Sequence, residues 1–177
     1  MMSKKPIYSI VLILILFLNC SEGSRTYHDN EYGFSFDYPS DWKVANESIH
    51  HQVLIYEPVK DTVNQVATNI SVVVKSNHDI PLNIRAELIE QEWDDSNQYK
   101  NFEILEKRDG IFQNEKAVYY KCQANVEDFP VMWRKVILII DDSFYDISMT
   151  TTKNKFDEKN LVFNDFLNSF SLDYSKN

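Results

Sequence analysis

The 177-residue sequence predicts an α+β fold in which an antiparallel β-sheet is sandwiched by helices. Short segments that alternate apolar and polar residues predict strands, and the turn residues between successive segments favour antiparallel pairing. Two other segments carry apolar residues at helical spacing, one in the middle of the chain and one near its end. Strands, a helix, more strands and a final helix are typical of an α+β sandwich.

The aromatic segment Tyr32–Pro39 is the first predicted strand. Its aromatic residues stand at every second position and therefore share one face: Tyr32, Phe34, Phe36 and Tyr38. Gly33 permits a backbone geometry that other residues resist, and the turn Pro39-Ser40-Asp41 leads into Trp42-Lys43-Val44, so we expect a hairpin-like opening. We interpret the aromatic residues as core; the alternative is that Tyr38 and Trp42 line a ligand cleft.

Two strands and a helix follow this opening. The strands are predicted at Val53–Tyr56 and Thr68–Val74, the second of which is rich in β-branched residues. A stripe of apolar residues then predicts a helix over Leu82–Trp93, and Pro81 suits its first turn. The stripe consists of Leu82, Ala86, Ile89 and Trp93.

Four further strands are predicted at Phe102–Lys107, Glu115–Asn125, Val131–Ile140 and Phe144–Thr151. Cys122 shares a strand face with three small or apolar neighbours, so we expect a packed core thiol and not a reactive one. Residues 136–140 are apolar on both faces, which is typical of a central strand covered on each side. Asp141 and Asp142 then make a polar turn.

The last predicted element is a helix that begins near Asn154, a good capping residue, with Asp157 three residues further on. Its inward face is expected to carry Phe163, Phe166, Leu167 and Phe170.

The N-terminus predicts an exported and lipidated protein. Lys4 and Lys5 precede the apolar run Ile7–Leu18, whose 12 residues reach about 18 Å as a helix, against roughly 30 Å of hydrocarbon. The next residues, ending in Cys20, resemble a lipobox, at which bacterial lipoproteins are acylated on cysteine and cleaved just before it. The alternatives are an uncleaved anchor or a plain signal peptide.

The chain is therefore expected to have three parts. Residues 1–19 are a lipoprotein signal peptide, residues 20–26 are the lipidated Cys20 with a short tether, and residues 27–177 are a single globular domain. This domain lies outside the cytoplasm in each of the alternatives. Ser21 after Cys20 is compatible with delivery to the outer membrane of a double-membraned cell.

Charge disfavours nucleic acid as a partner. The chain has 18 basic and 27 acidic residues, a net charge of −9; loss of Lys4 and Lys5 with the signal peptide leaves 16 against 27, or −11. Such a body repels phosphate backbones and anionic headgroups, so the acyl chains on Cys20 are expected to hold the protein at the membrane. Cys122 is the other cysteine, so the mature domain has no internal disulfide.

Two end motifs resemble the PsbP-like domain family. Tyr32–Trp42, with Gly33 and Pro39, resembles the family's opening hairpin, and Phe166–Phe170 resembles its closing helix. The element order agrees over the whole exported part. The resemblance implies an antiparallel sheet between helices, and a likeness to small extracytoplasmic lipoproteins and to accessory subunits of the photosynthetic oxygen-evolving complex. Fold transfers across such a resemblance better than function does.

Motifs for catalysis, cofactor binding or metal binding are absent: the sequence has no GxSxG, HExxH or CxxC, no P-loop and no dinucleotide fingerprint. We therefore expect no catalytic residue, no cofactor and no metal. None of the histidines has a partner at ligand spacing on a predicted helix: His28, His50, His51 and His78. His50 and His51 are interpreted as a solvated loop pair, Asp94 and Asp95 as a solvated helix end, and Asp141 and Asp142 as turn residues.

The leading hypothesis is a non-enzymatic interaction or accessory module of the bacterial cell envelope, with an envelope protein as its partner. An exposed patch that holds Trp93, Tyr99 or Trp133 would favour it. The alternative is a carrier of a small ligand or metal that uses a cleft between sheet and helix, with Arg134 among its polar groups. An enzyme ranks lowest, because no motif supplies its chemistry.

Overall fold

The computed structural model describes residues 23–48, 51–59, 66–95, 99–126 and 128–172. The strands formed by these residues are β1 (Ser24–Asp29), β2 (Phe34–Pro39), β3 (Lys43–Ser48), β4 (His51–Tyr56), β5 (Asn69–Ser76), β6 (Tyr99–Phe112), β7 (Glu115–Val126), β8 (Phe129–Ile140), β9 (Ser143–Thr152) and β10 (Ser171–Leu172). The helices are α1 (Leu82–Asp95), the 3₁₀ turn η1 (Lys153–Lys155) and α2 (Phe156–Ser169). Cys20 and the predicted signal peptide lie outside the described residues, and no helix within those residues is long and apolar enough to cross a membrane.

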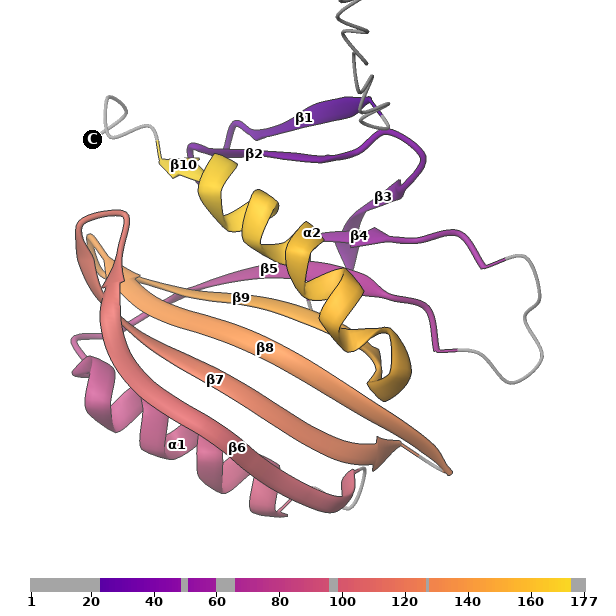
Figure 1. Ribbon diagram of the computed structural model, residues 1–177. Coiled ribbons are helices and arrows are strands. Elements are labelled where there is room, and N and C mark those ends of the chain that lie inside the picture. Colours follow the sequence, from indigo (N-terminus) through magenta and orange to yellow (C-terminus); the bar gives the residue numbers. More distant parts are fainter. Residues whose placement is uncertain (1–22, 49–50, 60–65, 96–98, 127, 173–177) are drawn as a thin grey trace, which may run out of the picture.

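A seven-stranded antiparallel sheet in the order β3-β4-β5-β9-β8-β7-β6 forms the centre of the molecule. Hairpins connect β6 to β9 in succession, and α1 carries the chain from β5, inside the sheet, to β6 at its edge. Figure 1 shows α1 on one face of this sheet and α2 on the other. The predicted α+β fold, an antiparallel sheet between helices, is therefore confirmed.

Strand β8 contributes to both faces of the sheet, as its apolar sequence predicts. Val136, Leu138 and Ile140 lie in the core beneath α2. Ile137, which points the other way, packs in a second core with the α1 stripe. In that stripe Ala86, Ile89 and Trp93 are all buried. The helix predicted over Leu82–Trp93 is thus present and two residues longer.

The opening of the chain differs from the predicted hairpin. β2 does not pair with the residues after Trp42; it pairs with β1 and β10 in a separate three-stranded sheet, while β3 pairs with β4 in the large sheet. Phe34 and Phe36 are buried against α2, so β2 lies over that helix and the chain must cross to the large sheet at the Pro39 turn. The burial of the β2 residues therefore follows the predicted alternation, but the predicted pairing of β2 with the residues after Trp42 is wrong.

The predicted tether is shorter than expected. Residues 24–26, expected to belong to it, form the first half of β1 and pair with Pro39, Tyr38 and Asp37 of β2. The Ser40 N–H also donates a hydrogen bond to the Gly23 carbonyl at 2.7 Å. Backbone pairing therefore begins almost directly after Cys20 in the sequence.

The final helix starts later than predicted and without the expected cap. Asn154 lies in η1, and α2 begins at Phe156 with no side-chain capping bond from Lys155. The Asn154 side chain accepts a hydrogen bond from the Thr152 hydroxyl instead. The inward face is as predicted, because Phe163, Phe166, Leu167 and Phe170 are all buried.

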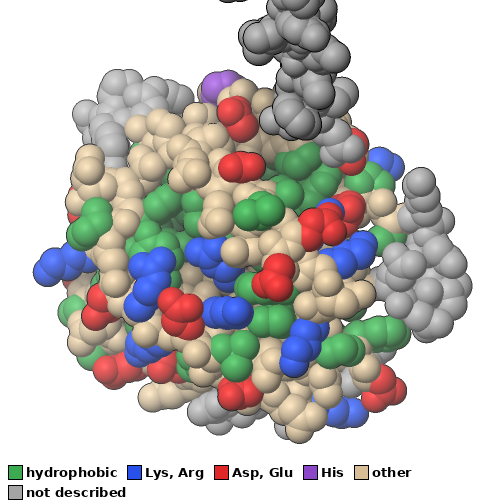
Figure 2. All heavy atoms as spheres, viewed as in Figure 1, with side chains coloured by type: hydrophobic (Ala, Val, Ile, Leu, Met, Phe, Trp, Pro, Cys, Tyr) green, Lys and Arg blue, Asp and Glu red, His purple; other side chains and the backbone are tan. Residues whose placement is uncertain are grey.

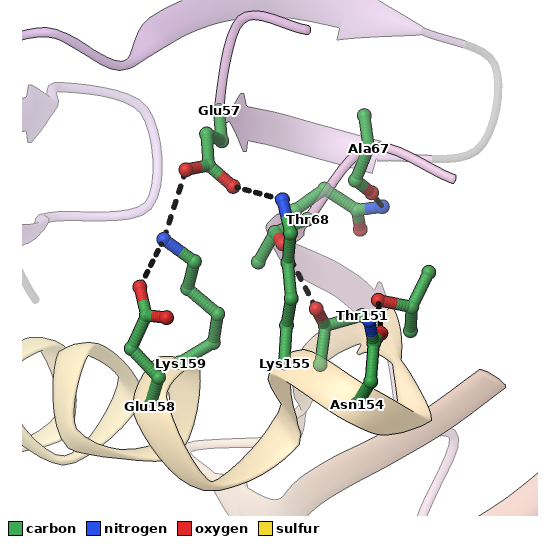
Figure 3. A network of polar contacts seen from close by, with 10 residues as sticks. Glu57, Ala67, Thr68, Thr151, Asn154, Lys155, Glu158 and Lys159 are labelled. Carbon is green, nitrogen blue, oxygen red and sulfur yellow. Dashed lines mark hydrogen bonds and ion pairs between the residues drawn. The ribbon is translucent and has the colours of Figure 1, made fainter. Parts of the chain in front are cut away.

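A polar network fixes the first half of α2 to the end of β4 (Figure 3). The Lys159 ammonium lies 2.9 Å from the Glu57 carboxylate and 3.0 Å from that of Glu158, and Lys155 approaches Glu57 at 3.7 Å. The Lys159 side chain is only 9% exposed. Since α2 covers part of the large sheet, this network also fixes the separation between the start of that helix and the sheet.

Candidate functional site

A polar groove lies where the start of α2 passes over the edge of the large sheet. We call it the cationic groove; its volume is about 240 Å³, and its lining includes Glu106, Arg108, Tyr119, Lys121, Arg134, Phe156, Asp157 and Asn160. It is a cleft between sheet and helix, and Arg134 is part of it, as the carrier hypothesis predicted. Figure 2 shows Lys and Arg side chains gathered in the middle of this side of the molecule, with Asp and Glu among them.

The register of three neighbouring strands places the charges of the groove side by side. Lys121 on β7 is the direct partner of Glu106 on β6 and of Arg134 on β8. Arg108, two residues beyond Glu106, lies opposite Tyr119. Strand alternation puts all of these residues on the α2 face. Two cations directly opposite each other, as Lys121 and Arg134 are, destabilise a sheet unless something offsets their repulsion.

Arg134 is held by neutral groups. Its Nη1 donates hydrogen bonds to the side-chain oxygens of Asn160 and Asn164, the latter at 2.8 Å. Its guanidinium carbon lies 5.5 Å from the centre of the Phe163 ring. Burial lowers the pKa of the Arg134 guanidinium and the charge of Arg108 lowers it further, against smaller opposing effects from Glu106 and Tyr119. The group nevertheless stays protonated, as arginine does in proteins.

A second concavity lies on the opposite, α1 face of the sheet. We call it the aromatic pocket; its volume is about 370 Å³. Its apolar and aromatic lining residues are Val66, Trp93, Tyr99, Val126, Val131 and Trp133, and its polar lining residues are Asn69, Ser71, Lys135, Ser148 and Thr150. Trp133 lies 5.4 Å from Tyr99 and 6.4 Å from Trp93, measured between ring centres.

Polar lining residues of the aromatic pocket are paired with one another or with a neighbour. Lys135 forms an ion pair with Asp146 at 2.6 Å, and its ammonium lies 5.2 Å from the centre of the Trp93 ring. The Ser71 and Ser148 hydroxyls are 3.0 Å apart and hydrogen-bonded. The pocket therefore offers both apolar ring surfaces and hydroxyl and amide groups, which suits a ligand with both kinds of surface.

An exposed patch that holds Trp93, Tyr99 or Trp133 would have favoured the interaction module, and these residues do not form one. Trp93 and Trp133 are 9% and 6% exposed and Tyr99 is half-buried. They line a pocket because α1, which carries Trp93, packs across the sheet strands that carry Tyr99 and Trp133. A partner would have to insert a group into the pocket instead of lying on a flat patch.

The alternative role for Trp42 and Tyr38 is resolved separately for each residue. Trp42 is buried in the core beneath α2. Tyr38 is half-buried and lines a surface groove of about 440 Å³ between β2 and α2, together with Asp37, Asp165 and Ser169. The core interpretation therefore holds for Trp42, whereas Tyr38 also faces solvent.

The remaining candidates for chemistry are dispersed. Cys122 is fully buried, and this burial raises the pKa of its thiol to about 12. His28 is exposed on β1 and His78 is exposed in the turn before α1. His50 lies outside the described residues, and His51 is the first residue of β4, so the loop that we predicted for it is wrong. Asp141 and Asp142 form the β8–β9 turn with positive φ, as predicted. Within the described ranges, no three His, Cys, Asp or Glu residues are grouped so that they could hold a metal ion.

Sequence reasoning missed Arg108 and Lys121. Both are cations at positions that strand alternation turns toward α2, as Arg134 is. The signal for Lys121 was a cation at an inward position of a predicted strand, whereas Arg108 lies one residue beyond the strand predicted at Phe102–Lys107 and belongs to the longer β6. Which of these positions adjoin depends on strand order and register, and these become visible only in the structure.

The family model described as PsbP matches residues 22–172. The solution structure of cyanobacterial PsbP (CyanoP) from Synechocystis sp. PCC 6803 is similar, with a TM-score of 0.64 and 14% identity, covering 86% of this chain and 94% of that one. The crystal structure of LpqN, described as involved in cell envelope biogenesis of Mycobacterium tuberculosis, has a TM-score of 0.64 and 10% identity, covering 85% and 90%. A protein of unknown function from Pseudomonas aeruginosa, described as a putative regulator, has a TM-score of 0.52 and 15% identity, covering 80% and 91%. No curated protein matches the sequence significantly.

Proposed function

The chain belongs to the PsbP family, and from this premise we propose that it is a lipid-anchored, extracytoplasmic accessory module of the bacterial cell envelope that acts by binding, not by catalysis. The structural likeness to LpqN, a protein described as involved in cell envelope biogenesis, is consistent with that location. At 10% identity the likeness extends to the fold, so the role itself is inferred from this chain's own residues.

The observation that carries the proposal is the position of Cys20. The family match begins at residue 22 and β1 begins at Ser24. A lipidated Cys20 would therefore be joined to the folded domain by a segment that spans at most about 14 Å, at roughly 3.6 Å per residue. Acyl chains on Cys20 would then hold the small sheet and α2 toward the bilayer.

The aromatic pocket is the surface that we assign to a protein partner. Figure 1 shows α1 on the far side of the large sheet from β1, so this pocket faces away from the anchored end. Tryptophan and tyrosine are the residue types that dominate binding energy at interfaces, most of all around a pocket that a partner residue fills. A volume of about 370 Å³ accommodates such a side chain.

Crosslinking in native cells, followed by detergent extraction and mass spectrometry, tests this proposal. Wild type is compared with Cys20→Ala, which loses the anchor, and with Tyr99→Ser, which removes a half-buried wall of the aromatic pocket. Tyr38→Ser is the matched control, because it removes a half-buried tyrosine from the opposite side of the molecule. We expect a partner that wild type and Tyr38→Ser capture and that the other two variants lose.

The same experiment reads the mass of the N-terminal peptide. An acylated Cys20 peptide supports the anchor, and an unmodified residue 20 in membrane fractions contradicts it. Capture of one partner by all four forms would contradict the assignment of the aromatic pocket.

A carrier of a small ligand is the second candidate function. The cationic groove favours it, because a cleft between sheet and helix holds three cationic side chains, Arg108, Lys121 and Arg134. Titration of the folded protein with small anions tests this second function.

A further inference from the structure

Three cations face the cationic groove, and each is positioned by an uncharged group. The guanidinium carbon of Arg108 lies 3.9 Å from the centre of the Tyr119 ring. The Lys121 ammonium lies 4.8 Å from the centre of the Phe156 ring. Arg134 is held by two asparagine oxygens and the Phe163 ring. Stacking on rings orients these cations without neutralising them.

Carboxylates offset this charge only in part. Glu106 forms an ion pair with Arg108 Nε at 3.3 Å. Asp157, also in the lining, forms no ion pair with any described residue. Neither Lys121 nor Arg134 has a carboxylate within ion-pair distance among the described residues. The groove thus carries three positive and two negative side chains, in a protein whose net charge is −9.

Most of the donors on these cations remain available. A guanidinium has five N–H groups; the two asparagine oxygens take those on Nη1 of Arg134, which leaves Nε and Nη2. Glu106 takes Nε of Arg108, which leaves both of its terminal nitrogens. Lys121 makes no hydrogen bond within the described chain, so its three N–H donors also remain. The start of α2 adds the positive end of a helix dipole to the same site.

We propose that the cationic groove binds the phosphoryl group of a small ligand through Arg108, Lys121 and Arg134. Two planar guanidiniums and one ammonium, arranged around a gap, suit a tetrahedral dianion that can accept from several donors at once. The groove volume of about 240 Å³ leaves room for a phosphate with a small substituent.

This inference rests on the second candidate function, the small-ligand carrier, and does not depend on the lipid anchor or on the aromatic pocket. An anion between Arg108 and Arg134 would also relieve the repulsion that lowers the pKa of Arg134 and the cross-strand repulsion between Lys121 and Arg134. Binding is therefore expected to raise thermal stability as well.

Inorganic phosphate is the probe for the test. The full chain, purified in a non-ionic detergent, is titrated at pH 7 with sodium phosphate, with sodium chloride at the same ionic strength, and with acetate. Amide resonances and the melting temperature are followed. We expect saturable shifts at residues of β6, β7 and the start of α2 with phosphate, and only small linear shifts with chloride and acetate.

Arg108→Gln and Lys121→Gln test the assignment without emptying the core, because the Arg108 side chain is 49% exposed and Lys121 is half-buried. Each is expected to weaken phosphate binding at least fivefold while the spectrum stays folded. Lys116→Gln is the matched control, since Lys116 is an exposed lysine on the same strand whose position alternates to the other face; it should leave the affinity unchanged. Saturation that is equal with acetate, or equal in all three variants, would overturn the proposal.

Glycerol 3-phosphate distinguishes the sources of the phosphoryl group. Binding at least tenfold tighter than that of inorganic phosphate supports a substituted ligand such as a lipid headgroup. Equal binding supports free phosphate. Absence of saturable binding by both phosphates sinks the inference and leaves the accessory role untouched.

Discussion

Cys122 shows how burial decides the chemistry of one residue. Its thiol has no exposed surface, and burial, with a smaller effect of Glu90 and against the charge of Lys135, raises the pKa of the thiol to about 12. The thiolate is the nucleophile, so at pH 8 the native thiol should be inert toward an aromatic disulfide reagent. We expect no labelling in native buffer and full labelling in denaturant, as read by absorbance or mass. Rapid labelling of the folded protein would show that the β7 core opens.

Because the pKa of this thiol is raised in the folded state, the Cys122 thiol makes the folded protein less stable at high pH. Below the ordinary pKa of 9.0 the thiol keeps its proton in both the folded and the unfolded state, so the free energy of unfolding does not depend on its titration. Above it the unfolded state loses the proton first, so stability is lost as pH rises toward the folded pKa.

The Glu57–Lys159 ion pair should make the folded protein less stable at acid pH. Burial raises the pKa of the Glu57 carboxyl, but the hydrogen bond and charge of Lys159, with help from Lys155 and Thr68, outweigh it and leave that pKa below 4.5. The stabilisation is therefore present above pH 4.5 and is lost as pH falls through the lower folded pKa. Glu57→Gln should lower the free energy of unfolding by about 1–3 kcal/mol at pH 7, and this difference should shrink below pH 4.

Urea denaturation at several pH values measures this difference. Glu158→Gln is the control, because it removes the other carboxylate that contacts Lys159, but one that is 71% exposed. Exposed pairs contribute little. A pH-independent difference for Glu57→Gln would show that the side chain contributes through packing and not through charge.

At the scale of elements, helix α1 offers a comparison between adjacent positions. Ile89 is 8% exposed against the sheet, whereas Leu88 is 39% exposed. Ile89→Ala should cost about 2–4 kcal/mol of unfolding free energy and speed hydrogen exchange in α1. Leu88→Ala should cost less than about 1 kcal/mol. Equal costs would mean that the face of α1 that carries Ile89 is not what holds this helix to the sheet.

The helices and most strands could be predicted from the sequence, whereas the strands that pair with β2 could not. The α1 stripe and the alternation of β7 are local patterns. Which positions of each are buried and which are exposed can be read from neighbouring residues in the sequence. The partner of β2 is instead decided by contacts with Phe166 and Phe170, more than a hundred residues away. A turn at Pro39 looks the same whether the next strand joins β2 or another sheet.

Over the whole molecule, fold class was predictable and the candidate sites were predictable only in part. Arg134 was identifiable because a cation interrupts an apolar strand. Its companions Arg108 and Lys121 lie on ordinary charged strands, and only the register of β6, β7 and β8 brings the three together. Similarly, the α1 stripe predicted the burial of Trp93, but the pocket that Trp93 forms with Trp133 depends on where α1 crosses the sheet.

The short segment after Cys20 leads to a prediction about orientation at the membrane. If Cys20 is acylated, β1 lies within about 14 Å of the anchored residue, at roughly 3.6 Å per residue, whereas α1 lies beyond the large sheet (Figure 1). Arg25→Cys and Glu87→Cys place exposed labels on β1 and α1; Cys122 need not be removed, because its buried thiol is not labelled. In vesicles that carry a headgroup quencher, fluorescence at position 25 should be quenched severalfold more than at position 87. Equal quenching would contradict this orientation, and quenching that persists after Cys20→Ala would show that another surface holds the domain at the bilayer.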